Sequence, residues 1–229
     1  NFGVENSVLL PAYYEDVNNK NNAEIIFAVH FNKEIVNEGH SYWYDITNLT
    51  DESGQAEALV NCFTPGDTRK EMITYVKAEN KAYLMTKFLD TKNVSFNQVG
   101  NDQILLRYAD VLLMYAEALN ELGYDASEGS IALKQLNATR TRAGLTKLTA
   151  ADVPTQESFR KAILDERQKE FPYEGHRWFD LVRMGYAKSV LATQGLNIQD
   201  YQLLFPIPQT EIEKVGDSKI LWQNPGYDK

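Results

Sequence analysis

From residue 102 onward, apolar residues recur at helical spacing. The intervals are 4, 3, 4 and 3 residues, at Leu105, Ala109, Leu112, Ala116 and Leu119. This spacing places the five side chains on one face of an amphipathic helix. Tyr108, Val111 and Tyr115 widen the apolar stripe, so we expect the helix to be buried on more than one side. We expect Gly123 to end it in a left-handed conformation.

Three more helices are predicted further along the chain, over residues 128–143, 156–171 and 176–184. A short connection joins the first of these to the preceding helix, which favours an antiparallel hairpin. Pro172 ends the helix over 156–171 because proline lacks a backbone N–H. Residues 203–208 contain two prolines, so we expect them to form an extended apolar strap along the helices.

Residues 1–101 follow a different pattern. They are rich in loops, and short runs of β-branched and aromatic residues over 25–31, 74–76 and 83–85 predict strands. We therefore predict a single, mostly α domain over residues 1–229. It would consist of tetratricopeptide-like helical hairpins with irregular loops, a few short strands and a C-terminal strap.

Charge and composition exclude several classes of protein. The 229 residues carry 23 basic and 32 acidic side chains, a formal net charge of −9. Such a surface repels phosphate backbones, so we expect no nucleic-acid partner. Cys62 is the single cysteine, which excludes an internal disulfide and a cysteine-based zinc site. No run approaches ~18 apolar residues, so no transmembrane helix is expected.

Motifs for catalysis, metals and cofactors are absent. The chain has no Gly-x-Ser-x-Gly elbow, no His-Glu-x-x-His motif and no glycine-rich phosphate loop. Its three histidines, His30, His40 and His176, have no neighbours that indicate a catalytic triad. We therefore expect no enzymatic activity, no bound metal and no cofactor.

The helix over 156–171 carries three carboxylates that could serve a glycoside hydrolase, namely Asp165, Glu166 and Glu170. They alternate with basic residues, which favours structural ion pairs such as Arg167 with Glu170 at i, i+3. Glu166 and Glu170 fall on the apolar face, where a buried carboxylate requires a partner. We expect Arg177 or Arg183 to supply it.

Aromatic residues offer a further kind of site. The chain has 13 Tyr, 10 Phe and 3 Trp, and Tyr42, Trp43 and Tyr44 are consecutive in a polar loop. Tyr and Trp rings can stack on the apolar faces of sugars, while nearby Asn and Asp side chains bind the hydroxyls. We predict these three residues as the ligand-binding platform. The alternative is that Trp43 fills the core.

Five sequence blocks resemble the SusD/RagB family. They cover residues 104–120 (ILLRYADVLLMYAEALN), 136–144 (LNATRTRAG), 163–171, 174–183 (EGHRWFDLVR), and a closing pair at 204–209 and 223–227. Residues 24–29 are also similar to that family. The likeness covers most of the chain and is strongest between residues 102 and 227.

This resemblance implies a lipid-anchored protein on the outer membrane surface of Bacteroidota-type bacteria. Such proteins bind glycans or other nutrients without catalysis and form the lid on a TonB-dependent transporter of the SusC type. Family members are about twice as long, so we expect this chain to be a C-terminal half whose lipidated N-terminus lies elsewhere. The shared motifs are structural, and none of them supports Tyr42, Trp43 and Tyr44. Two alternatives stay open, a protein scaffold docking on the transporter and a binder of peptides or other nutrients.

Overall fold

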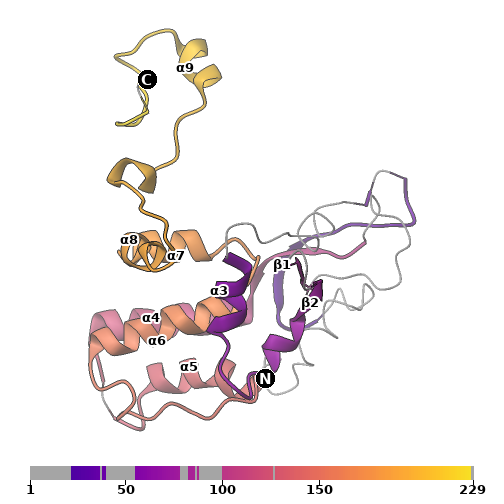
Figure 1. Ribbon diagram of the computed structural model, residues 1–229, viewed down its shortest axis with the longest axis vertical. Coiled ribbons are helices and arrows are strands. Elements are labelled where there is room, and N and C mark those ends of the chain that lie inside the picture. Colours follow the sequence, from indigo (N-terminus) through magenta and orange to yellow (C-terminus); the bar gives the residue numbers. More distant parts are fainter. Residues whose placement is uncertain are drawn as a thin grey trace. The chain divides into compact units, whose positions relative to one another are not determined.

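The computed structural model describes residues 22–36, 38–39, 55–77, 82–85, 87, 100–125 and 127–227 (Figure 1). Residues Asn1–Arg177 form one compact unit and Trp178–Lys229 a second. The predicted fold class is confirmed, because helices dominate and the strands are few and short. The assignment of all 229 residues to one domain stays a prediction.

Helices α4 (Tyr108–Leu122), α5 (Ile131–Arg142) and α6 (Gln156–Glu170) form the centre of the first unit. Helix α4 packs against both α5 and α6, and α3 (Gln55–Cys62) packs against α6. The buried apolar side chains come mainly from the three central helices, including Leu113, Ala116, Leu136, Phe159 and Ile163. Helices were predicted in all three places, and the bounds of α5 and α6 agree closely with the prediction.

The helix predicted from residue 102 begins later than its apolar spacing implies. Residues Gln103–Arg107 form strand β4, which pairs antiparallel with β1 (Ile25–Val29). Leu105 therefore lies on a strand and is 43% exposed, not on the buried face of α4. A second antiparallel pair joins β2 (Ile73–Lys77) and β3 (Ala82–Met85), and the 3-10 helix η1 (Thr68–Met72) precedes it.

Gly123 does not end α4 in a left-handed conformation, as was expected, whereas Gly144 adopts a positive φ just after α5. Gly123 has a φ of 175°, which is extended backbone that any residue adopts. Gly144 has a φ of +80°, and a Cβ on it would lie 3.2 Å from the carbonyl oxygen of Gly66. Glycine is thus needed at residue 144 for both its backbone conformation and the close approach of a neighbouring loop.

Helix α4 has an exposed apolar stripe that no described element covers. Its buried residues face α5 and α6, whereas Val111, Met114, Tyr115 and Leu122 are 38%, 46%, 44% and 87% exposed. Two of the three residues expected to widen the buried stripe, Val111 and Tyr115, are therefore exposed, although α4 contacts both α5 and α6. The outer stripe was apolar in the sequence, but no described element packs over it.

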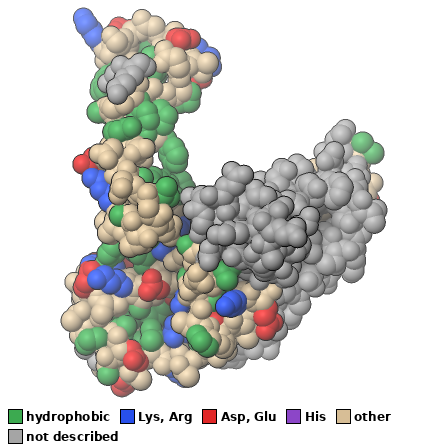
Figure 2. All heavy atoms as spheres, in the orientation of Figure 1, with side chains coloured by type: hydrophobic (Ala, Val, Ile, Leu, Met, Phe, Trp, Pro, Cys, Tyr) green, Lys and Arg blue, Asp and Glu red, His purple; other side chains and the backbone are tan. Residues whose placement is uncertain are grey.

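The second unit contains α7 (Arg177–Arg183, which begins at its boundary), α8 (Ala187–Ala192), η3 (Asp200–Leu203) and α9 (Gln209–Val215). The prolines of residues 203–208 lie in extended backbone between η3 and α9, as predicted. The Gln223 side chain accepts from the Ile207 N–H at 2.7 Å and donates to the Ile207 carbonyl at 2.8 Å. These two bonds fix the extended segment to residues near the C-terminus. Apolar side chains are exposed along this unit (Figure 2), among them Phe205, Ile220 and Trp222.

Among the described residues, none of the helices combines the length and the apolar content needed to cross a membrane.

We predict that Gly226→Ala disrupts the C-terminal segment. A Cβ at residue 226 would lie 2.5 Å from the Tyr201 ring, and the φ of +93° is itself unfavourable for alanine. Gly195→Ala is the matched control, because Gly195 has a φ of +79° with open space around its Cβ. Limited proteolysis should show faster cleavage after residue 200 in Gly226→Ala than in Gly195→Ala. Equal cleavage would mean that the contact with Tyr201 does not matter.

Candidate functional site

A network of buried charges joins the helices of the first unit to its loops and strands. At its centre lies Glu170 on α6, whose side chain is fully buried. Its carboxylate accepts from Arg69 at 2.9 Å, from Arg107 at 2.7 Å and from Arg142. Its backbone carbonyl accepts from Arg107 at 2.7 Å and from Lys87 at 3.1 Å.

Glu166 lies one helical turn before Glu170 and extends the network towards η1. Its carboxylate accepts from Arg69 Nη1 at 2.7 Å, and Arg140 Nη1 lies 3.6 Å away. Asp67 holds the guanidinium of Arg69 through two bonds of 2.9 Å, to Nε and Nη2. The orientation of Arg69 is therefore fixed on one side by its own loop and on the other by α6.

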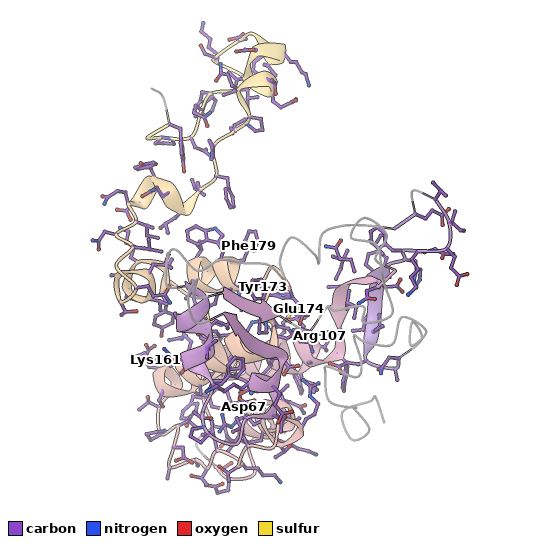
Figure 3. All side chains as sticks on the ribbon, turned by 45° about the vertical axis from the view of Figure 1, so that its right-hand side comes forward. Asp67, Arg107, Lys161, Tyr173, Glu174 and Phe179 are labelled. Atoms are coloured by element: carbon purple, nitrogen blue, oxygen red, sulfur yellow. The ribbon has the colours of Figure 1, made fainter. Side chains whose placement is uncertain are left out.

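Glu174, in the turn after α6, accepts from Arg107 Nε at 2.8 Å and Nη2 at 2.9 Å, and also from Lys87 (Figure 3). Burial alone would raise the pKa of the Glu174 carboxyl, but Arg107 and Lys87 lower it to about 2. Burial lowers the pKa of Lys87 to about 8, although Glu174 opposes this shift. Tyr173, just before Glu174, has a φ of +60°, a conformation that non-glycine residues rarely adopt.

The network is balanced in charge. Its described members are five carboxylates and five cations: Glu24, Asp67, Glu166, Glu170 and Glu174, with Arg69, Lys87, Arg107, Arg140 and Arg142. Glu24 connects the start of β1 to two different elements, since it pairs with Arg107 at 2.9 Å and with Arg142 at 3.1 Å. Charges persist in a protein interior when they are paired and hydrogen-bonded. Two buried atoms of this network, Glu166 Oε2 and Arg140 Nε, have no hydrogen bond to any described residue, although Arg140 Nη1 lies 3.6 Å from Glu166 Oε2.

Phe171 lies beside this network and packs against two of the chain's arginines. The guanidinium carbons of Arg107 and Arg167 are 4.4 Å and 5.0 Å from the centroid of its ring. Such cation–π contacts stabilise guanidinium groups that have been removed from water.

The structure favours the structural interpretation of the α6 carboxylates over glycoside hydrolysis. Glu166 and Glu170 are both held by arginines, so neither is a free acid or nucleophile. Asp165, the third candidate, is exposed on α6, and partial desolvation raises its pKa.

The partners predicted for these carboxylates were wrong. Arg167 pairs with Asp110 on α4 at 2.6 Å, not with Glu170. Arg177 donates to the Leu164 carbonyl at 3.0 Å, and Arg183 pairs with Asp180 at 2.8 Å. The partners of the buried carboxylates come from η1, β4 and α5, which spacing within one helix cannot reveal.

A pocket of about 1090 Å³ lies next to the network, and Arg142 belongs to both. It is bounded by α4, α5 and the loops at residues 128–130 and 147–149. Asn137 on α5 fixes the second loop, because its amide donates to the Leu148 carbonyl at 2.9 Å and accepts from the Leu148 N–H at 2.8 Å. This volume lies slightly above the ~300–1,000 Å³ typical of small-molecule sites. Sequence reasoning missed it because its walls come from both helices and two loops.

The aromatic platform predicted from the sequence, Tyr42, Trp43 and Tyr44, lies outside the described residues.

Within the part that the structure describes, no group of three His, Cys, Asp or Glu side chains could hold a metal ion. Burial raises the pKa of the Cys62 thiol to about 11, so this thiol is protonated and unreactive at neutral pH.

Comparisons with known proteins show one family. A family model described as "SusD family" matches residues 69–196. SusD-like protein P2 from Formosa agariphila is 36% identical over 140 residues, which are 56% of this chain and 26% of that protein. Starch-binding protein SusD from Bacteroides thetaiotaomicron is 31% identical over 147 residues, 60% of this chain and 24% of that protein.

Solved structures match along almost the whole chain. Surface glycan-binding protein A from Bacteroides fluxus superposes with a TM-score of 0.73 at 26% identity, over 96% of this chain and 55% of its own. A laminarin binding SusD-like protein superposes with a TM-score of 0.67 at 26% identity, over 96% of this chain and 54% of its own. The matched region spans about a quarter of the curated relatives and about half of these solved chains.

We predict that Arg107→Met lowers the free energy of unfolding by roughly 3–5 kcal/mol, since it leaves buried carboxylates without a partner. Arg160→Met is the matched control, because Arg160 makes similar ion pairs with Glu121 and Glu157 at the surface. Its loss should cost about 1 kcal/mol or less. Urea denaturation followed by circular dichroism measures the free energy of unfolding of both variants. Similar losses for the two variants would contradict a central role of the network.

We also predict a specific acid sensitivity from Glu174. Its folded-state pKa of about 2 lies below its ordinary value of 4.5. Its ionised form therefore contributes stability that is fully present above about pH 4.5 and lost as the pH falls towards 2. Glu174→Gln should lower stability at neutral pH and flatten the profile between these values. Glu157→Gln, at an exposed ion pair, should leave the profile unchanged, and an equally steep profile in Glu174→Gln would refute the assignment.

Proposed function

Because the chain belongs to the SusD family, we propose that it is a glycan-binding, non-catalytic component of an outer-membrane nutrient-uptake complex. The observation that carries the proposal is the match to two solved proteins named for glycan and laminarin binding, each over 96% of this chain. The curated starch-binding relative supports the same class of ligand.

In this proposal, the chain acts at the cell surface of a Bacteroidota-type bacterium. Its partner is a SusC-like, TonB-dependent transporter, and a lipid anchor holds the complex to the outer membrane. The acidic net charge of −9 suits a neutral or hydroxyl-rich ligand better than a polyphosphate.

We assign the main sugar contact to Tyr42, Trp43 and Tyr44. Aromatic faces stack on the C–H faces of sugar rings, and the polar side chains of the same loop bind hydroxyls. Each such contact is small, so the affinity for a single sugar is weak and oligosaccharides gain by filling several contacts at once.

A second candidate function is docking on another protein. The apolar outer stripe of α4, with Val111, Met114, Tyr115 and Leu122 exposed, favours it. A docking surface and a glycan site can coexist in one SusD-family protein.

An oligosaccharide array tests the proposal, with Trp43→Ala beside the wild-type chain. We expect glycan binding that falls roughly five- to tenfold in Trp43→Ala, the loss expected for one aromatic contact. Trp222→Ala is the control, because Trp222 is 63% exposed in the other unit. Unchanged binding in Trp43→Ala would remove the aromatic loop from the site. If the wild type binds no glycan, the glycan proposal fails, and a peptide array and transporter pull-down become the next measurements.

A further inference from the structure

The pocket between α4 and α5 is basic in an acidic chain. It is lined by three basic side chains, Lys134, Arg142 and Lys147, and by one acidic side chain, Glu128. The chain as a whole has nine more acidic than basic residues. A local excess of positive charge therefore stands out against the rest of the sequence.

Not all of these charges are available to a ligand. Arg142 is committed to the buried network through Glu24 and Glu170. The Glu128 carboxylate accepts a hydrogen bond from the Ala150 N–H at 2.7 Å. This bond does not neutralise the negative charge of Glu128. Lys134 and Lys147 are exposed and make no ion pair with any described residue. With two lysines against one carboxylate, the accessible part of the pocket has an excess of positive charge.

The pocket also provides surfaces suited to sugar rings. Tyr108, Leu112, Leu133 and Leu148 supply apolar wall, and the Gln135 amide adds a hydrogen-bonding group. Hydrogen bonds hold the walls in place. The Asn137 side-chain amide binds the Leu148 backbone through its nitrogen and its oxygen, and Ser130 caps the first turn of α5. Lys147 directly precedes Leu148, so its backbone lies next to a part of the wall that is fixed to α5.

We propose that this pocket binds an anionic oligosaccharide. Carboxylate or sulfate groups of the ligand would pair with Lys134 and Lys147, while a sugar ring contacts Tyr108 and the neighbouring leucines. This inference rests on the proposed glycan-binding function and narrows it to acidic glycans, at a site separate from the aromatic loop.

Isothermal titration calorimetry with matched ligands tests the inference. The probes are a tetragalacturonate, its fully methyl-esterified form and a sulfated galactan tetrasaccharide. We expect at least one anionic probe to bind about tenfold or more tightly than the uncharged ester, with an affinity that falls as salt rises. The first and third probes distinguish carboxylate from sulfate as the recognised group.

Lysine variants connect the binding to this pocket. Lys134→Gln and Lys147→Gln should each weaken anionic binding about threefold or more, and the double variant about tenfold. Lys134→Arg keeps the charge and should retain binding. Lys219→Gln, at an exposed residue of the other unit, is the control. Thermal melting of each variant verifies that it folds.

The outcomes separate the two proposals. Equal binding of charged and esterified probes would overturn the acidic-glycan inference and leave the glycan function standing. Anionic binding that survives loss of both lysines would place the ligand outside this pocket. If none of the three probes binds while the array detects a glycan, the inference fails and the proposed function stands. If the array also detects none, both fail.

Discussion

The fold of the first unit depends on Glu170. This carboxylate lies with no exposure to solvent where arginines from η1, β4 and α5 converge. An ion removed from water is tolerated only when its charge and hydrogen-bonding capacity are met by the protein. The positions of three separate elements are therefore determined by one side chain of α6. Apolar packing brings α4, α5 and α6 together, and the network fixes how the loops and strands join them.

The helices were predictable because their apolar periodicity is local. The bounds of α6 agree with the prediction within a residue, and a threonine capping box marks its start. The start of α4 was missed because Leu105 satisfies a helical and a strand pattern equally well. Pairing with β1, which is more than 70 residues away, decides between the two. Local spacing contains no information about such a partner.

The candidate site was harder to predict for the same reason. Arg107 stands out in the sequence as a charge within an apolar run, and Arg140 and Arg142 are two residues apart, yet neither feature identifies a partner. Glu166 and Glu170 were expected to need cationic partners. Both do pair with arginines, but not with the ones that were predicted. The lysines of the pocket carried no signal at all, because exposed lysines are common and only the fold brings Lys134 and Lys147 to one cavity. Tyr42, Trp43 and Tyr44 stay predictions from loop position and chemistry.

The buried network has a consequence for how the chain folds during synthesis. Arg69, Arg107 and Arg142 leave the ribosome before the carboxylate that they share, and Arg69 precedes Glu170 by 101 residues. Until α6 has been made, Glu24 and Asp67 can pair with these arginines, but Glu166 and Glu170 cannot. The segment from η1 to α5 therefore lacks three of the five carboxylates that balance its buried cations, namely Glu166, Glu170 and Glu174. Formation of the core is postponed to a late, cooperative step in which distant parts of the chain meet, which is the behaviour of a slowly folding topology.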